Sequence, residues 1–115
     1  MLHARYWTTT YPTIALLPMA ALVETVNRRD FSRVSVPALF YYSKNDLVVD
    51  PVQTKSFVKG WGGSKTVLHP KLSEKDDKYA HVIAGDIVSA HQTDFAVDGI
   101  LHWLEAQQGW PISGR

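Results

Sequence analysis

Two side chains with acid–base chemistry lie in separate polar turns of the chain. Asp46 lies in FYYSKNDLVVDP (residues 40–51), and His81 lies in KYAHVIAGD (residues 78–86). A carboxylate that accepts a hydrogen bond from an imidazole fixes the tautomer of the ring and stabilises the imidazolium when the ring acts as a base. We therefore predict that Asp46 and His81 form a catalytic acid–base pair.

Each of these side chains has a simpler alternative explanation. Aspartate is common in a turn after a strand, because its carboxylate accepts hydrogen bonds from the nearby backbone. A single histidine beside apolar residues is often only packed or solvated. The two residue types alone therefore leave a structural role open for both Asp46 and His81.

Two predicted strands would bring this pair together. Residues 36–42 are apolar on both faces, as expected for a buried parallel strand, and Asp46 follows them. Residues 65–69 (KTVLH) form a second short strand, and His81 follows it after a charged loop. Loops that leave the carboxyl ends of neighbouring parallel strands meet at one edge of the sheet.

Three helices complete the predicted architecture. One runs from Pro12 to about Val26, and another covers residues 51–59 after the capping sequence Asp50-Pro51. The last helix spans residues 92–107, and we expect its inner side to carry Phe95, Val97, Ile100, Leu101 and Leu104. The fold class is therefore α/β, a βαβ unit with flanking helices. We expect a single domain over residues 1–115, with an irregular arm at 1–11 and a mobile tail at 109–115.

The composition excludes several function classes. The chain has 115 residues, a net charge of +1 and interspersed charges, which argues against nucleic-acid binding. It has no cysteine, and its five histidines lack metal-ligand spacing, so we predict no disulfide, metal site or cofactor. The apolar stretch 14–23 is shorter than the roughly 20 residues needed to span a membrane. We expect a cytoplasmic protein.

The joint pattern resembles a known family. VPALFYYSKNDLVVDP, followed by a helix, a short strand and YAHVIAGDIVS before a terminal helix, resembles the C-terminal part of the α/β-hydrolases. The nearest likeness is to lysophospholipase and monoacylglycerol-lipase-like members. The resemblance implies that residues 12–108 are equivalent to the last strands and helices of the hydrolase sheet. It also implies that Asp46 is the acid of a catalytic triad and His81 its base.

The nucleophile of such a triad is missing from the sequence. Family members attack the substrate with a serine in G-x-S-x-G, which precedes the acid and the histidine in the chain. The nearest imitation, GGSKT at residues 62–66, lacks the second glycine and lies between Asp46 and His81. Loss of the nucleophile lowers the rate on the order of a millionfold. We therefore expect a truncated or partial serine hydrolase of the carboxylic-ester class, inactive alone.

Two other functions remain open. The chain is alternatively a non-catalytic, self-associating scaffold module derived from a hydrolase, or it has weak esterase activity through a water activated by His81. A sheet of two strands has open edges, so we expect a homodimer or a complementary hydrolase half as partner. A small-molecule ester is a ligand only of the completed site, and the sequence does not identify it.

Overall fold

A computed structural model describes residue 8 and residues 10–107. The predicted tail (109–115) and most of the predicted arm (1–11) lie outside these residues. The chain divides into two compact units, residues 1–31 and residues 32–115, and each is described by itself. The expected single domain stays a prediction.

The first unit contains a 3-10 helix, η1 (Thr13–Ala15), and an α-helix, α2 (Leu16–Asn27). The helix predicted from Pro12 to Val26 is thus confirmed, with a tighter first turn. Pro18 is tolerated because it lies in the first turn of α2, where backbone N–H groups have no partner within the helix. No residue of α2 is buried. Within the described part of the chain, no helix is long and apolar enough to cross a membrane.

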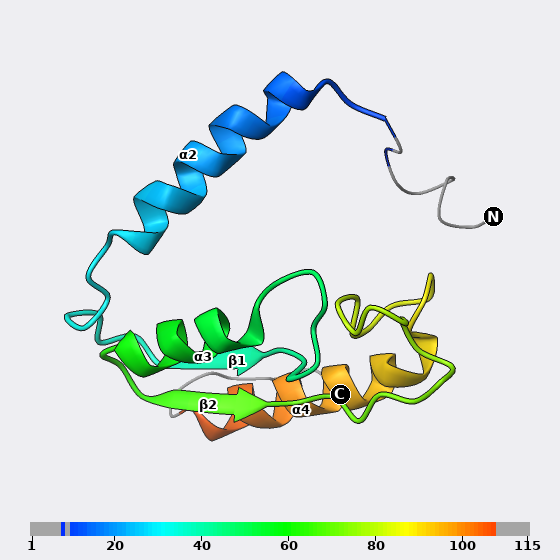
Figure 1. The fold of residues 1–115 in the computed structure, drawn as a ribbon. Helices are drawn as coiled ribbons and strands as arrows, with labels where there is room; N and C mark the ends of the chain where they lie inside the picture. Colours follow the sequence, from blue (N-terminus) through cyan, green and yellow to red (C-terminus); the bar gives the residue numbers. More distant parts are fainter. Residues whose placement is uncertain (1–7, 9, 108–115) are drawn as a thin grey trace. The chain divides into compact units, whose positions relative to one another are not determined.

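The second unit contains a parallel sheet of two strands, β1 (Ala38–Tyr41) and β2 (Lys65–Leu68). The helix α3 (Pro51–Gly60) connects them, and α4 (Thr93–Ala106) ends the unit. Figure 1 shows α3 on one side of the sheet and α4 on the other. The α/β class and the βαβ unit with flanking helices are therefore confirmed.

Local sequence explains where α3 begins. Oδ1 of Asp50 accepts a hydrogen bond from the backbone N–H of Val52 at 2.8 Å, as expected of an N-terminal cap. Pro51 is the first residue of the helix, where its missing N–H has no cost. The helix ends at Gly60. The cap and the end of α3 therefore agree with the sequence-based prediction.

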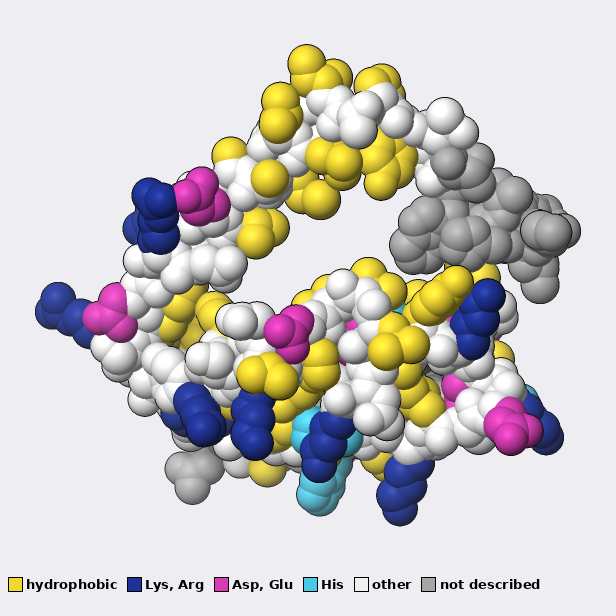
Figure 2. Space-filling view, in the orientation of Figure 1, with side chains coloured by type: hydrophobic (Ala, Val, Ile, Leu, Met, Phe, Trp, Pro, Cys, Tyr) yellow, Lys and Arg dark blue, Asp and Glu magenta, His cyan; other side chains and the backbone are white. Residues whose placement is uncertain are grey.

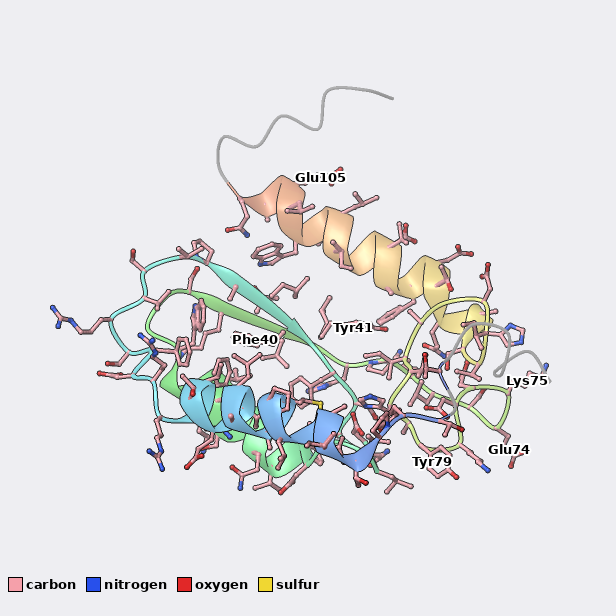
Figure 3. The ribbon with its side chains drawn as sticks, turned by 90° about the horizontal axis from the view of Figure 1, so that it is seen from above. Phe40, Tyr41, Glu74, Lys75, Tyr79 and Glu105 are labelled. Atoms are coloured by element: carbon pink, nitrogen blue, oxygen red, sulfur yellow. The ribbon has the colours of Figure 1, made fainter. Side chains whose placement is uncertain are left out.

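Successive side chains of β1 supply the two faces of the sheet. Phe40 packs on the α3 side, with its ring centroid 6.2 Å from that of Phe57 and 5.9 Å from that of Trp61, both edge-to-face. Tyr41 points the other way, and its ring lies 6.5 Å from that of Phe95 of α4 (Figure 3). This alternation follows from the two-residue period of a strand.

Two glycines allow close backbone and helix packing. A Cβ atom on Gly63 would lie 2.1 Å from the carbonyl oxygen of Val36, just before β1. A Cβ atom on Gly99 would lie 2.8 Å from the side chain of Leu68. The turn into β2 therefore requires glycine at residue 63, whereas a larger residue at position 99 would require the end of the Leu68 side chain to shift.

The inner side of α4 differs from the prediction. The buried residue of α4 is Ala96, whereas Phe95, Val97 and Ile100 are exposed and Leu101 and Leu104 are half-buried. Phe95 nevertheless faces the sheet, because its ring is the one that lies near Tyr41. The physical reason is the width of the sheet, because two short strands cover only part of a helix face.

Candidate acid–base site

The structure brings Asp46 and His81 together. Asp46 lies in the turn after β1 and His81 in the loop that follows β2, so both stand beyond the carboxyl ends of the strands. Nδ1 of His81 is 2.9 Å from Oδ2 of Asp46. This is the geometry of a hydrogen bond between a carboxylate and an imidazole. The contact agrees with the proposed pair, and the catalytic role stays a prediction.

The two oxygens of Asp46 have different partners. Oδ1 accepts hydrogen bonds from the backbone N–H groups of Val48 and Val49 at 2.8 and 2.9 Å. Oδ2 is then available to His81. Asp46 is therefore a turn residue as well as the partner of the imidazole. The structural role in the turn and the proposed acid–base role are therefore compatible in this one side chain.

The surroundings of Asp46 keep its carboxylate ionised. Burial raises its pKa, which is the largest single effect, and the side chain is only 13% exposed. The hydrogen bonds from Val49, His81 and Val48 together outweigh burial, so the pKa of Asp46 lies below its ordinary value. An ionised Oδ2 only accepts, which assigns the proton of the imidazole to Nδ1.

The free nitrogen of His81 is the reactive position. With the proton on Nδ1, Nε2 carries the lone pair. Among the residues that the structure describes, no group hydrogen-bonds Nε2, and the His81 side chain is 40% exposed. The arrangement therefore presents a hydrogen-bond acceptor at Nε2 and an ionised carboxylate behind the ring. It can take a proton from a group that approaches Nε2.

Asp77 positions the backbone of His81. Its Oδ2 accepts hydrogen bonds from the N–H groups of His81 and Val82 at 3.1 and 2.9 Å, and its Oδ1 accepts one from Tyr79 at 3.2 Å. Burial raises the pKa of Asp77, but the three backbone bonds outweigh it and lower the pKa. The charge of this carboxylate therefore holds the loop that presents the imidazole.

Ser89 connects the ends of the same loop. It is fully buried, and its hydroxyl accepts a hydrogen bond from the N–H of Asp77 at 3.0 Å and donates one to the carbonyl of Val82. A hydroxyl engaged in this way serves the loop structure. The turn after β1 joins the loop through the N–H of Leu47, which donates to the carbonyl of Tyr79 at 2.9 Å.

Two other serines of the second unit also have structural contacts. Ser43 is buried, and its hydroxyl accepts a hydrogen bond from the N–H of Asn45 at 3.1 Å. Ser64, in the GGSKT segment, lies just before β2, and its carbonyl accepts from the N–H of Ala38 at 2.9 Å. Within residue 8 and residues 10–107, no serine hydroxyl hydrogen-bonds His81.

The sequence alone missed the importance of Asp77 and Ser89. The available signal for Asp77 was an aspartate at the start of a turn, where such residues accept bonds from the following N–H groups. Ser89 gave no comparable signal, because its partners are remote in sequence. No group of three histidine, aspartate or glutamate side chains suited to a metal ion occurs in the described part of the chain.

The arrangement is thus a carboxylate–imidazole pair at the carboxyl edge of a small parallel sheet. Comparison of the chain with protein-family models, with curated proteins and with solved structures found no match.

Proposed function

We propose that this chain is the acid–base part of a serine-type carboxylic-ester hydrolase of the α/β-hydrolase kind. The observation that supports it most directly is the 2.9 Å contact between Oδ2 of Asp46 and Nδ1 of His81, with Nε2 free. In this proposal β1, α3, β2 and α4 are equivalent to the last strands and helices of the hydrolase sheet. The complementary hydrolase half carries the serine.

The proposed chemistry divides between the two residues and the missing serine. In a completed site, the serine hydroxyl transfers its proton to Nε2 of His81 as its oxygen attacks the ester carbonyl. Asp46 stabilises the imidazolium that forms, and His81 then gives the proton to the leaving alcohol. A water molecule repeats the sequence and releases the acid. Without the nucleophile the rate falls on the order of a millionfold, so the chain alone is inactive.

Complementation tests this proposal. The chain is mixed with a hydrolase segment that contains G-x-S-x-G, and the release of p-nitrophenol from a short-chain ester is measured. We expect turnover in the mixture, its loss with His81→Ala, and its retention with His102→Ala, which alters an exposed histidine of α4. Turnover that survives His81→Ala would contradict the proposed base.

A labelling experiment tests the missing nucleophile. A fluorophosphonate probe is added to the isolated chain, and the modified residues are identified by mass spectrometry. We expect no stoichiometric labelling, because the serines lack the sequence of a nucleophile elbow. Labelling at one serine that also requires His81 would show that the chain contains its own nucleophile.

The second candidate function is a self-associating scaffold module. It is favoured by the exposed apolar side chains of α2, among them Leu17, Met19, Leu22 and Val23. A helix with an apolar surface of this kind is typical of a segment that packs against a partner. Light scattering at micromolar concentration distinguishes the cases: a dimer favours the module, and a compact monomer contradicts it.

A further inference from the structure

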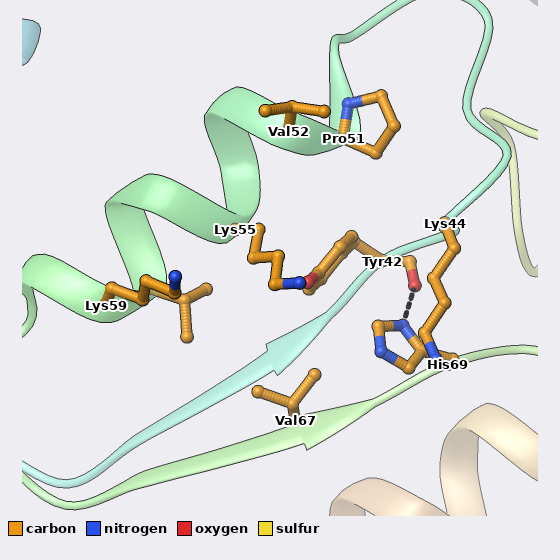
Figure 4. A pocket seen from close by; sticks show the side chains of 9 residues that line it. Tyr42, Lys44, Pro51, Val52, Lys55, Lys59, Val67 and His69 are labelled. Carbon is orange, nitrogen blue, oxygen red and sulfur yellow. Dashed lines mark hydrogen bonds between the residues drawn. The ribbon is translucent and has the colours of Figure 1, made fainter.

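A concave site separate from the acid–base pair lies beside α3 on the sheet. The pocket has a volume of about 550 Å³ and lies between α3 and the strands (Figure 4). Its apolar wall includes the side chains of Val58 and Val67 and the ring of Tyr42. This volume is within the range of about 300–1,000 Å³ typical of small-molecule sites.

The polar lining of this pocket is cationic. Lys44, Lys55 and Lys59 line it together with His69, and no aspartate or glutamate does. Within the described residues, none of the three lysines forms an ion pair with a carboxylate. Figure 2 shows lysine and arginine side chains beside a histidine on the α3–β2 side of this unit.

The positions of two of the lysines carry an energetic cost. Lys55 and Lys59 are four residues apart on α3, so their side chains share one face of the helix. Like charges at this spacing repel each other. An anion between them removes the repulsion and gains charge-assisted hydrogen bonds. The pocket is therefore electrostatically complementary to a negatively charged group.

The far wall of the pocket is held in place. Nδ1 of His69 is 2.8 Å from the carbonyl oxygen of Tyr42, which assigns the Nδ1 proton to this bond. The ring of Tyr42 and the imidazole ring of His69 meet edge-to-face, with centroids 4.7 Å apart. These two contacts join the residue that follows β1 to the residue that follows β2, which preorganises this wall of the pocket.

We propose that this pocket binds a small organic phosphate. The phosphate lies between Lys55 and Lys59 with Lys44 nearby, and the organic body lies against Tyr42, Val58 and Val67. Three cations without an acid favour a dianion over a monoanion, and lysine binds phosphate as a point charge. The apolar wall favours a phosphate that carries an apolar substituent over the inorganic ion. The site does not contain Asp46 or His81, so it is independent of the proposed hydrolase function.

Phenyl phosphate is the probe that tests the site. Its binding to the full chain is measured by calorimetry and by amide NMR shifts at low salt. We expect the largest shifts in residues 42–44, 52–59 and 67–69. Lys55→Gln and Lys59→Gln should each weaken binding about tenfold or more, because each removes a charged hydrogen-bond donor. Lys75→Gln, an exposed loop lysine outside the pocket, is the matched control and should change nothing.

Three comparisons decide the outcome. Inorganic phosphate should bind more weakly than phenyl phosphate, and so should benzoate, which carries one charge. The proposal is overturned if inorganic phosphate or benzoate binds as tightly as phenyl phosphate, or if phenyl phosphate does not bind at millimolar concentration. It is also overturned if Lys75→Gln weakens binding as much as Lys55→Gln and Lys59→Gln do. Binding of phenyl phosphate is measured on the isolated chain, whereas the hydrolase proposal is tested by turnover after complementation, so the failure of one proposal can be distinguished from the failure of the other.

Discussion

The second unit and helix α2 are held together in different ways. Between residues 32 and 107, much of the chain is irregular, yet the loop around His81 has buried side chains such as Ser89 and Gln92. Helix α2 is regular, but it has no buried residue. Within the first unit, a helix is therefore regular without burying a side chain, whereas an irregular loop of the second unit has buried side chains.

The loop and the helix should respond differently to substitution. In the loop, the carboxylate of Asp77 accepts three backbone hydrogen bonds from the residues that follow it, and the Ser89 hydroxyl bonds groups 7 and 12 residues away, so each has several contacts to lose. In α2, the backbone bonds of the helix are local, and side chains such as that of Leu22 contribute little burial. Measurements of the unfolding free energy of substituted chains test this difference.

Gly63→Ala should have the largest effect. The new Cβ atom would lie 2.1 Å from the carbonyl oxygen of Val36, so the backbone must move. We expect a loss of about 3 kcal/mol in the free energy of unfolding, measured in urea. Gly60→Ala is the control, because nothing lies within 4 Å of its Cβ position. A Gly63→Ala chain as stable as that control would contradict the close approach.

Ser89→Ala should come next. The substitution leaves the N–H of Asp77 and the carbonyl of Val82 without the hydroxyl that bonds both. We expect a loss of about 2 kcal/mol, because unsatisfied buried groups keep their desolvation cost. Ser56→Ala, at an exposed position of α3, should change the unfolding free energy by less than about 0.5 kcal/mol. Similar values for both substitutions would remove Ser89 from the loop network.

Asp77→Asn should change the dependence of stability on pH. The pKa of Asp77 is lowered in the folded chain, so its contribution is present above its ordinary pKa near 4 and is lost as pH falls through the folded value. We expect the unfolding free energy of the wild-type chain to decrease as the pH drops below about 4. The unfolding free energy of Asp77→Asn should decrease less steeply over the same range. Part of the pH dependence of the unfolding free energy remains in this variant, because the pKa values of Asp46 and Asp76 are also lowered. Identical slopes in urea titrations across acidic pH would contradict this role.

Leu22→Ala should have the smallest effect. The side chain is 63% exposed, so its truncation removes little burial, and alanine has the higher helix propensity. We expect a change within about 0.5 kcal/mol in the unfolding free energy of the monomer. A loss above about 2 kcal/mol would show that this face of α2 is covered in solution, and it would favour the scaffold module if light scattering shows that the chain is a dimer.

Much of the second unit could be predicted from local patterns. The apolar run before Ser43 predicts β1, and Asp50 with Pro51 predicts the start of α3. These signals work because caps and the two-residue period of a strand depend on near neighbours. The pairing of Asp46 with His81 also followed from the parallel order of two strands. The inner face of α4 could not be predicted from local patterns, because it depends on the width of the sheet.

The order of the elements, the capped start of α3 and the presence of an aspartate and a histidine beyond two strands all follow from local sequence patterns. Only the tertiary structure decided that Asp77 and Ser89 hold the loop of His81, and that three lysines meet at one pocket. The reason is the range of the interactions. Caps and periodicity act over a few residues, whereas hydrogen bonds and charges across a loop or a pocket depend on where the folded backbone places remote residues.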